Sequence, residues 1–130
     1  MKNIEVVCAI IFNENDEVFC CRRGPGRALE GFYEFPGGKV EKNETNEEAI
    51  IREIKEELNT IIKPVKYIGK VYQEYKNIDN PYSIVMYAYK CVIVKGELEL
   101  REHTDKLWVK KDKLKEIKFA EADIQFIDML

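Results

Sequence analysis

Three carboxylates lie close together in the stretch REIKEEL, residues 52–58: Glu53, Glu56 and Glu57. On a helix, like charges three and four residues apart repel by about 0.2–0.5 kcal/mol per pair. Clustered carboxylates also supply the hard oxygen ligands that Mg²⁺ and Mn²⁺ prefer, and a bound cation converts the repulsion into binding energy. The stretch is therefore either a divalent-cation site or a solvated charged face, and taken alone it favours the solvated face.

A helix over residues 47–58 would gather these carboxylates on one side. With a turn of about 100° per residue, they fall within an arc about 100° wide. Ala49 lies inside this arc and leaves room for a ligand, whereas Arg52 and Lys55 fall outside it. The neighbouring stripe is apolar, which is typical of a core face; it comprises Ile50, Ile51, Ile54 and Leu58.

The ends of this helix are also predicted by the sequence. Thr45 and Asn46 are both competent N-caps, and the acidic pair Glu47 and Glu48 suits a first turn. Asn59 tolerates the left-handed conformation that ends many helices. We therefore expect a helix that begins near Thr45 or Asn46 and stops near Asn59.

Two other metals fit this helix poorly. An EF-hand calcium site is excluded because its ligands come from a spaced twelve-residue loop. Zinc is not expected, because the only histidine is His103 and no cysteine is near. The four cysteines, Cys8, Cys20, Cys21 and Cys91, form no C-x-x-C pair, and Cys20 and Cys21 should face opposite sides of a strand. We interpret them as reduced core or surface thiols of a cytoplasmic protein, without a metal or redox role.

Composition limits the partners. The 130 residues suit one domain, here 1–130, with 45% apolar and 35% charged residues. A net charge of −3 gives no support for stable nucleic-acid binding, although a local basic patch could still bind a small anion. No apolar run approaches the roughly 20 residues that span a membrane. Glu5 interrupts the N-terminal apolar stretch and no cleavage site follows, which favours a strand over a signal peptide. We expect a monomer or homodimer that binds a small molecule.

The order of elements indicates an α+β fold, a mixed central sheet sandwiched between helices (α/β/α). A loop is expected at 24–31, and Pro36 with the pair Gly37–Gly38 should end the strand before them. Residues 96–100 alternate, 111–117 form a lysine-rich turn, and 121–130 have helical apolar spacing. Apolar runs predict strands at 5–12, 17–22, 32–35, 63–75, 82–94 and 106–109.

The residues upstream of the helix decide between the two interpretations of REIKEEL. From Gly38, the stretch GKVEKNETNEEAIIREIKEELNT resembles the Nudix box, G-x5-E-x7-R-E-U-x-E-E-x-G-U, where U is aliphatic. Two positions depart from the pattern: Asn59 replaces the second glycine and Thr60 the last aliphatic residue. Neither is a metal ligand in the pattern. Seven of the nine defined positions match: Gly38, Glu44, Arg52, Glu53, Ile54, Glu56 and Glu57.

The resemblance covers the whole chain. CCRRGPGR, FYEFPGGKVE, REH…LW and FAEAD look like MutT-type Nudix proteins, above all the branch that hydrolyses 8-oxo-dGTP, CTP and oxidised or methylated pyrimidine nucleotides. It implies a central mixed sheet between helices and a loop–helix–loop metal site. It also implies that Mg²⁺, or Mn²⁺ in its place, supports hydrolysis of a nucleoside triphosphate to a monophosphate plus pyrophosphate, as in nucleotide-pool sanitation.

Roles for the signature residues follow from the resemblance. Glu53, Glu56 and Glu57 bind metal, and the Gly37 carbonyl adds a ligand. Glu53 is the candidate general base, although some family members draw the base from another loop. Arg52 and Glu44 pair to fix the loop against the helix. Glu102, six residues before Trp108, resembles a loop glutamate that reaches the metals; His103 beside it is interpreted as a packing or surface residue.

Phosphate contacts are expected where the second strand enters the loop. Arg22 and Arg23 point to opposite faces of a strand, and the resemblance favours Arg23. Lys39 is a second candidate, and Gly37 with Gly38 would allow close backbone approach. Surface charge and a simple turn are the alternatives.

Base recognition rests on the FAEAD segment. Asp123 aligns with a residue that reads the base edge, and a carboxylate accepts hydrogen bonds from the amine of cytosine or guanine. Its alternative role is to cap the last helix. Four aromatic residues are candidates for stacking on the base, with core packing favoured for any one of them: Phe32, Tyr87, Tyr89 and Phe119.

Two rival functions remain open at this point. One is a Nudix enzyme for another nucleoside diphosphate linked to a group X, such as ADP-ribose, a dinucleotide polyphosphate or capped RNA. The other is a catalytically silent Nudix-like module that binds nucleotides or a partner, which the intact glutamates argue against.

Overall fold

The protein is described by a computed structural model of residues 1–130. Seven strands, one α-helix and two 3₁₀ segments follow one another along the chain. The elements are β1 (Lys2–Ile11), β2 (Glu17–Arg22), β3 (Tyr33–Glu34), β4 (Gly37–Lys39), α1 (Asn46–Leu58), β5 (Ile61–Tyr75), β6 (Tyr82–Lys95), β7 (Asp105–Lys110), η1 (Lys111–Glu116) and η2 (Asp123–Met129).

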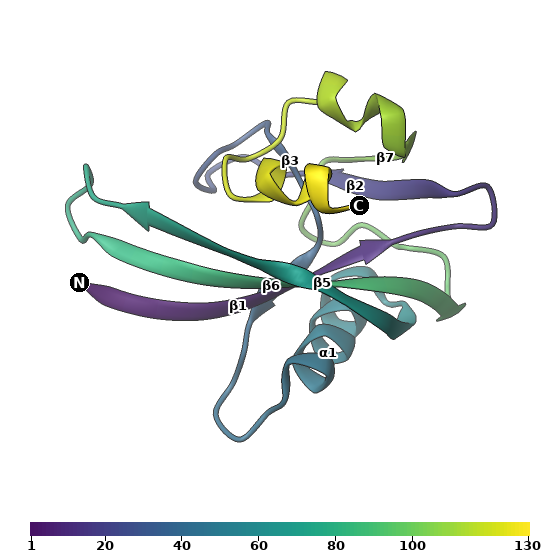
Figure 1. Cartoon of the computed structure of the whole chain (residues 1–130), viewed down its shortest axis with the longest axis horizontal. Helices are drawn as coiled ribbons and strands as arrows, with labels where there is room; N and C mark the ends of the chain where they lie inside the picture. Colours follow the sequence, from purple (N-terminus) through teal and green to yellow (C-terminus); the bar gives the residue numbers. More distant parts are fainter.

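The strands form two sheets. The larger has the order β4-β1-β6-β5, in which β1 and β6 run parallel and the other neighbours antiparallel. The smaller has the order β3-β2-β7 and is antiparallel throughout. In Figure 1, α1 lies on one side of the larger sheet, and the C-terminal segment lies on the other side with β2, β3 and β7. The predicted mixed sheet between helical layers is confirmed, with a second, smaller sheet added to it.

Two core clusters lie on the two sides of the larger sheet. One packs α1 against β1, and the other packs the C-terminal segment against the opposite side. Cys21 belongs to the first cluster and Cys20 to the second, which confirms that the two thiols face opposite sides of β2. All four cysteines are free and buried, so none is the surface thiol that the sequence left open.

Helix α1 begins and ends where its caps predict. Thr45 is the N-cap, and its side chain accepts a hydrogen bond from the Glu48 backbone N–H at 3.1 Å. The Glu48 side chain bonds the Thr45 backbone in return, which completes a capping box. Asn59 adopts the left-handed conformation, with φ 50° and ψ 42°. No helix is long and apolar enough to cross a membrane.

Three local features go beyond the predictions. The strand before Pro36 ends as expected, at Glu34, but Gly37 and Gly38 then form a further strand, β4, which pairs with β1 through Cys8↔Gly37 and Val7↔Gly38. The alternating segment 96–100 forms no strand, because Leu98 has a φ of 53° and its N–H bonds the Thr60 hydroxyl at 2.8 Å. The lysine-rich turn and the last helical segment are both 3₁₀ helices.

Candidate active site

Arg52 organises the carboxylates of α1. Its Nε and Nη2 donate to both oxygens of Glu44, at 2.7 and 3.0 Å, which confirms the predicted pair. Its Nη1 donates to Glu53 at 2.9 Å and to Glu56 at 3.3 Å. Arg52 lies outside the acidic arc of the helix, but its long side chain reaches back across it. A bidentate guanidinium with further carboxylate partners is a strong fixed contact.

The same contacts fix the charge states of this pair. The hydrogen bond from Arg52 and the backbone N–H of Glu41 lower the pKa of Glu44 to about 2. The carboxylates of Glu44 and Glu53 raise the pKa of Arg52 above its usual value. Arg52 also donates to the Lys39 carbonyl at 3.0 Å, so one guanidinium joins the loop, β4 and α1.

Glu57 is the buried member of the cluster, with a relative exposure of 9%. Burial raises the pKa of its carboxyl above the usual value, and a hydrogen bond with Glu53 raises it further. The charges of Glu102 and Glu34 act in the same direction. Without a cation, Glu57 therefore favours the protonated form, which is the expected state of a carboxyl crowded by other acids.

Sterics explain why positions 37 and 38 are both glycine. A Cβ on Gly38 would collide with the carboxylate of Glu53, and a Cβ on Gly37 would collide with the Val7 carbonyl. Glycine therefore allows β4 to lie directly against β1 and against the acidic end of the site.

The donor set fits a hard divalent cation, because it consists of carboxylate oxygens on one helix and the nearby Glu102. The structure does not yet bring these oxygens to one point. Glu56 is 59% exposed and turned to Arg52, and Glu102 is 57% exposed and 3.8 Å from Arg27. These two side chains have room to turn, whereas Glu53 is held by its hydrogen bond from Arg52 and Glu57 is buried.

A second group of titratable residues lies on the other side of Glu57. Arg23 Nη1 donates to Glu34 Oε1 at 2.6 Å, and His103 Nε2 donates to Glu34 Oε2 at 2.8 Å. Burial opposes ionisation of Glu34, but the hydrogen bonds from His103 and Arg23 outweigh it and lower the pKa. Glu34 is therefore an ionised carboxylate in a largely buried place.

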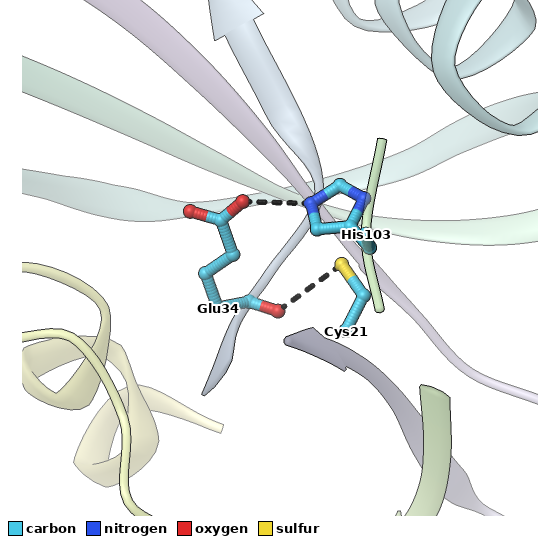
Figure 2. Close-up of side chains that lie close together, drawn as sticks. All are labelled: Cys21, Glu34 and His103. Atoms are coloured by element: carbon cyan, nitrogen blue, oxygen red, sulfur yellow. Dashed lines mark hydrogen bonds and ion pairs between the residues drawn. The ribbon is translucent and has the colours of Figure 1, made fainter. Parts of the chain in front are cut away.

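Figure 2 shows the Cys21 thiol and the His103 ring on the same side of Glu34. The Cys21 S–H donates to the Glu34 carbonyl, with sulfur and oxygen 3.6 Å apart. The His103 side chain has no exposed surface, and its Nδ1 has no hydrogen-bond partner. The expectation of a packing histidine is thus confirmed for burial, but the structure gives this histidine a carboxylate partner and a neighbouring thiol.

Asp123 lies close to this group. It is 3% exposed, and its Oδ2 accepts the Phe35 N–H at 2.9 Å. Burial and the charge of Glu34 raise the pKa of Asp123 to about 7. The alternative role as a helix cap is not seen: the N-cap of η2 is Ala122, and no side chain caps it.

Comparison with known proteins decides the family. The NUDIX domain model matches residues 2–130. The chain belongs to the Nudix family. Its membership confirms the resemblance of the 38–60 stretch and the expected hydrolase fold.

Curated relatives and solved structures match this chain over different shares of its length. CTP pyrophosphohydrolase of Escherichia coli (strain K12) is 30% identical over 128 residues, covering 98% of this chain and 91% of the relative. 8-oxo-dGTP diphosphatase of the same organism is 45% identical over 58 residues, and the match spans under half of each chain. The solution structure of a MutT Nudix hydrolase from methicillin-resistant Staphylococcus aureus 252 has a TM-score of 0.76 and 36% identity, covering 98% of this chain and 95% of that one.

The four aromatic residues predicted as candidates for stacking on the base do not lie together in the structure. Tyr87 and Tyr89 pack on the α1 side of the larger sheet, whereas Phe119 packs on the opposite side. Phe119 is only 5% exposed and its ring lies 5.0 Å from that of Phe35, so it is a core residue. Phe32 lies under the Lys118 ammonium, which is 4.3 Å from the ring centre.

The two arginines and Lys39 also differ in position. Arg22 bonds the Thr104 hydroxyl at 3.1 Å, and Arg23 bonds Glu34, so the two arginines have separate partners as expected. Lys39 is exposed and lines a surface groove with Asn3 and Glu5.

Two residues beside Asp123 were not singled out by sequence reasoning. Glu34 lies within FYEFPGGKVE, one of the stretches that carry the resemblance, but it was given no role of its own. Tyr75 stacks on Tyr82 with ring centres 4.9 Å apart. Burial and nearby anionic groups, Asp123 among them, raise the pKa of Tyr75 to about 12. No sequence motif identifies Tyr75, because it is the last residue of β5 and its stacking partner Tyr82 is the first residue of β6.

Proposed function

We propose that this Nudix hydrolase cleaves nucleoside triphosphates to a nucleoside monophosphate and pyrophosphate, with oxidised or cytidine nucleotides as substrates. The observation that carries the proposal is the α1 cluster, in which Arg52 ties Glu44, Glu53 and Glu56 to one loop–helix–loop unit. The names of the relatives, CTP pyrophosphohydrolase and 8-oxo-dGTP diphosphatase, support the substrate class.

Mg²⁺ is the proposed cofactor, with Mn²⁺ as a substitute. The residues that would hold it are Glu53, Glu56, Glu57, Glu102 and the Gly37 carbonyl. A divalent cation at this place neutralises the triphosphate charge and makes the attacking water more acidic. Glu57 is buried and would be a fixed ligand, whereas the exposed Glu56 side chain could turn toward the ion.

Glu53 is the proposed general base. Its carboxylate lies against Gly38 and is hydrogen-bonded by Arg52, so its orientation is fixed from two sides. A base must lie within hydrogen-bond reach of the proton that it removes, and a fixed carboxylate next to the phosphate site meets this need. Arg52 and Glu44 then act by positioning this base rather than by contacting the substrate.

Substrate binding is proposed on the other side of Glu57. Arg23 offers a guanidinium to the phosphates there, and Lys39 adds an exposed ammonium from the α1 side, where its carbonyl accepts from Arg52. Asp123 is the proposed residue that reads the base, since its carboxyl can accept from an exocyclic amine or, when protonated, donate to a carbonyl. We propose a cytoplasmic location, because all four cysteines are free thiols.

The test is a substrate panel with purified protein and Mg²⁺. Pyrophosphate release is measured for 8-oxo-dGTP, dCTP, CTP and 5-substituted deoxycytidine triphosphates, with ADP-ribose and a dinucleotide polyphosphate alongside. We expect kcat/KM to be highest for one of the triphosphates. A preference for ADP-ribose or the dinucleotide would move the protein to another Nudix activity. Tight nucleotide binding without Mg²⁺-dependent turnover of any compound would indicate a silent binding module.

A further inference from the structure

We propose that Cys21, Glu34 and His103 form a second cation site, suited to Zn²⁺ and similar soft divalent ions, and that an ion bound there inhibits hydrolysis. A sulfur, a carboxylate oxygen and an imidazole nitrogen from these residues all lie within 4.8 Å of one another. Figure 2 shows the three side chains converging on one place.

The backbone fixes this arrangement from three separate segments. Cys21 and Glu34 lie directly opposite each other where β2 pairs with β3. His103 comes two residues before β7, whose pairing with β2 ends at Arg22↔Asp105. Cys21 and His103 are 82 residues apart along the chain, so no motif spacing in the sequence identifies this set of ligands. His103 lies in the loop before β7, and this loop is held against β2 because the Thr104 N–H donates to the Arg22 carbonyl at 3.1 Å. Ligands held by strands and by such a bond are better placed for a metal than ligands on a free loop.

The ligand types select the ion. Thiolate and imidazole ligands suit Zn²⁺, whereas Mg²⁺ prefers oxygen and retains several waters. Three protein ligands leave a fourth position open for water or another oxygen. The Cys21–Glu34–His103 site is therefore chemically distinct from the α1 carboxylates, although the two lie close together.

Proton release accompanies binding. The Cys21 thiol must lose its proton to solvent, because the thiolate is the metal ligand. The ion replaces the hydrogen bond between His103 Nε2 and Glu34 Oε2, and the Nε2 proton moves to Nδ1, which has no partner in the structure. Glu34 is the least buried ligand of the three, with 14% of its side chain accessible, so an ion would enter past it.

No other cysteine has this environment. Cys20 is the next residue, but it faces the opposite core and its S–H donates to the Val18 carbonyl. Cys91 donates to the Tyr89 carbonyl of its own strand. The single histidine of the chain lies beside Cys21. Cys20 is therefore a matched control, because it is equally buried and lies on the same strand.

Inhibition follows from the shared neighbours of the two sites. Glu34 interacts electrostatically with both Cys21 and Glu57, and Arg23 pairs with its other oxygen. A cation on Glu34 would weaken its hold on Arg23 and place positive charge beside Glu57. Both changes oppose the arrangement proposed for phosphate and Mg²⁺. This part of the inference rests on the proposed function, whereas ion binding itself does not.

Binding is tested with Co²⁺, which substitutes for Zn²⁺ and gives a near-ultraviolet charge-transfer band when a thiolate binds it. We expect one equivalent of Co²⁺ to give the band in the wild-type protein, Zn²⁺ to remove it, and excess Mg²⁺ to leave it in place. Cys21→Ser should abolish the band and Cys20→Ser should retain it. His103→Gln should weaken Co²⁺ binding by about tenfold or more, since even loss of an outer partner of a metal ligand costs 10–100-fold.

A missing band in the wild-type protein, or one that survives Cys21→Ser, overturns the site. Should Cys21→Ser fail to fold, as judged by its melting curve, the weakening in His103→Gln and the resistance to Mg²⁺ decide the question. Inhibition is tested by adding Zn²⁺ at saturating Mg²⁺: the wild type and Cys20→Ser should lose activity at concentrations that leave Cys21→Ser active. Equal inhibition of all three overturns the inhibitory role. If the wild type hydrolyses none of the panel compounds, the proposed function and the inhibitory role fail together, and the Co²⁺ result alone decides the site.

Discussion

Two groups of acidic residues lie on either side of Glu57, and the protein stabilises their charges by different means. On α1, the guanidinium of Arg52 bonds Glu44, Glu53 and Glu56 near the surface. On the other side, Glu34 is ionised by two local hydrogen bonds, while the more deeply buried Asp123 has a pKa raised to about 7. The first group holds the carboxylates proposed to receive a cation, and the second holds Asp123, the residue proposed to read the base.

Burial explains the difference. Glu56 keeps more than half of its side chain in solvent, so repulsion there is screened and the side chain can turn toward an ion. Asp123 has no such freedom, because its Oδ2 is bonded to the Phe35 backbone inside the core. Glu57 interacts with both groups, so a change of charge in either group should change the pKa of Glu57.

The largest expected effect is on the α1 side. Glu53→Gln keeps the size of the side chain but removes the proposed base, so kcat should fall about 10²–10⁴-fold. The measurement is pyrophosphate release under saturating Mg²⁺. Glu47→Gln, an exposed change in the first turn of the same helix, should leave kcat within about twofold. Full activity in Glu53→Gln would assign the base to another residue, with Glu102 the next candidate.

The second prediction concerns pH on the Asp123 side. The folded pKa of about 7 lies above the unfolded value near 4, so the folded state binds the extra proton. Stability from this group is complete at low pH and is lost as pH rises through the folded pKa. The loss is at most about 4 kcal/mol.

Asp123→Asn should remove this slope. Denaturant unfolding between pH 4 and 8 measures it, with the free energy of the wild type falling relative to that of the variant as pH rises. The amide still accepts the Phe35 N–H, so the comparison isolates the charge. Parallel curves for the two proteins would show that Asp123 ionises with an ordinary pKa.

The third prediction tests Glu57 where the groups meet. Cation binding to the folded state alone should stabilise the wild type by about 2.7 kcal/mol at 100 times Kd. Glu57→Gln removes the buried acid, so the variant should melt higher than the wild type in a chelator and should gain little from Mg²⁺ or Mn²⁺. Glu47→Gln should keep the full gain. A wild-type Tm that is indifferent to saturating cation would mean that the α1 carboxylates bind no divalent cation.

Sequence and structure agree most where interactions are local. The caps of α1 at Thr45 and Asn59, and the bounds of β2, depend on neighbouring residues and were predicted closely. The Glu44–Arg52 pair was also found, because it is part of a fixed motif. Leu98 could not be predicted, because its turn depends on the distant Thr60 hydroxyl.

The second group shows why the rest of the site was missed. Cys21, Glu34 and His103 meet only because β2 pairs with both β3 and β7. Sequence reasoning set zinc aside since no cysteine was near the α1 carboxylates along the chain. Strand pairing brings Cys21 close to His103, 82 residues further along the chain, and no periodicity in the sequence predicts this contact.

The smallest expected effect is at the rim of the site. Lys39 is exposed, and an exposed charge pair contributes about 0.2–1 kcal/mol, so Lys39→Ala should raise KM by up to about fivefold with kcat unchanged. The effect should shrink at high salt, because solvent ions screen exposed charges. Lys42→Ala, three residues further along the same polar stretch, is the matched control and should not change KM. A loss of kcat in Lys39→Ala, or an equal rise of KM in both variants, would place Lys39 outside the phosphate site and leave Arg23 as its cationic residue.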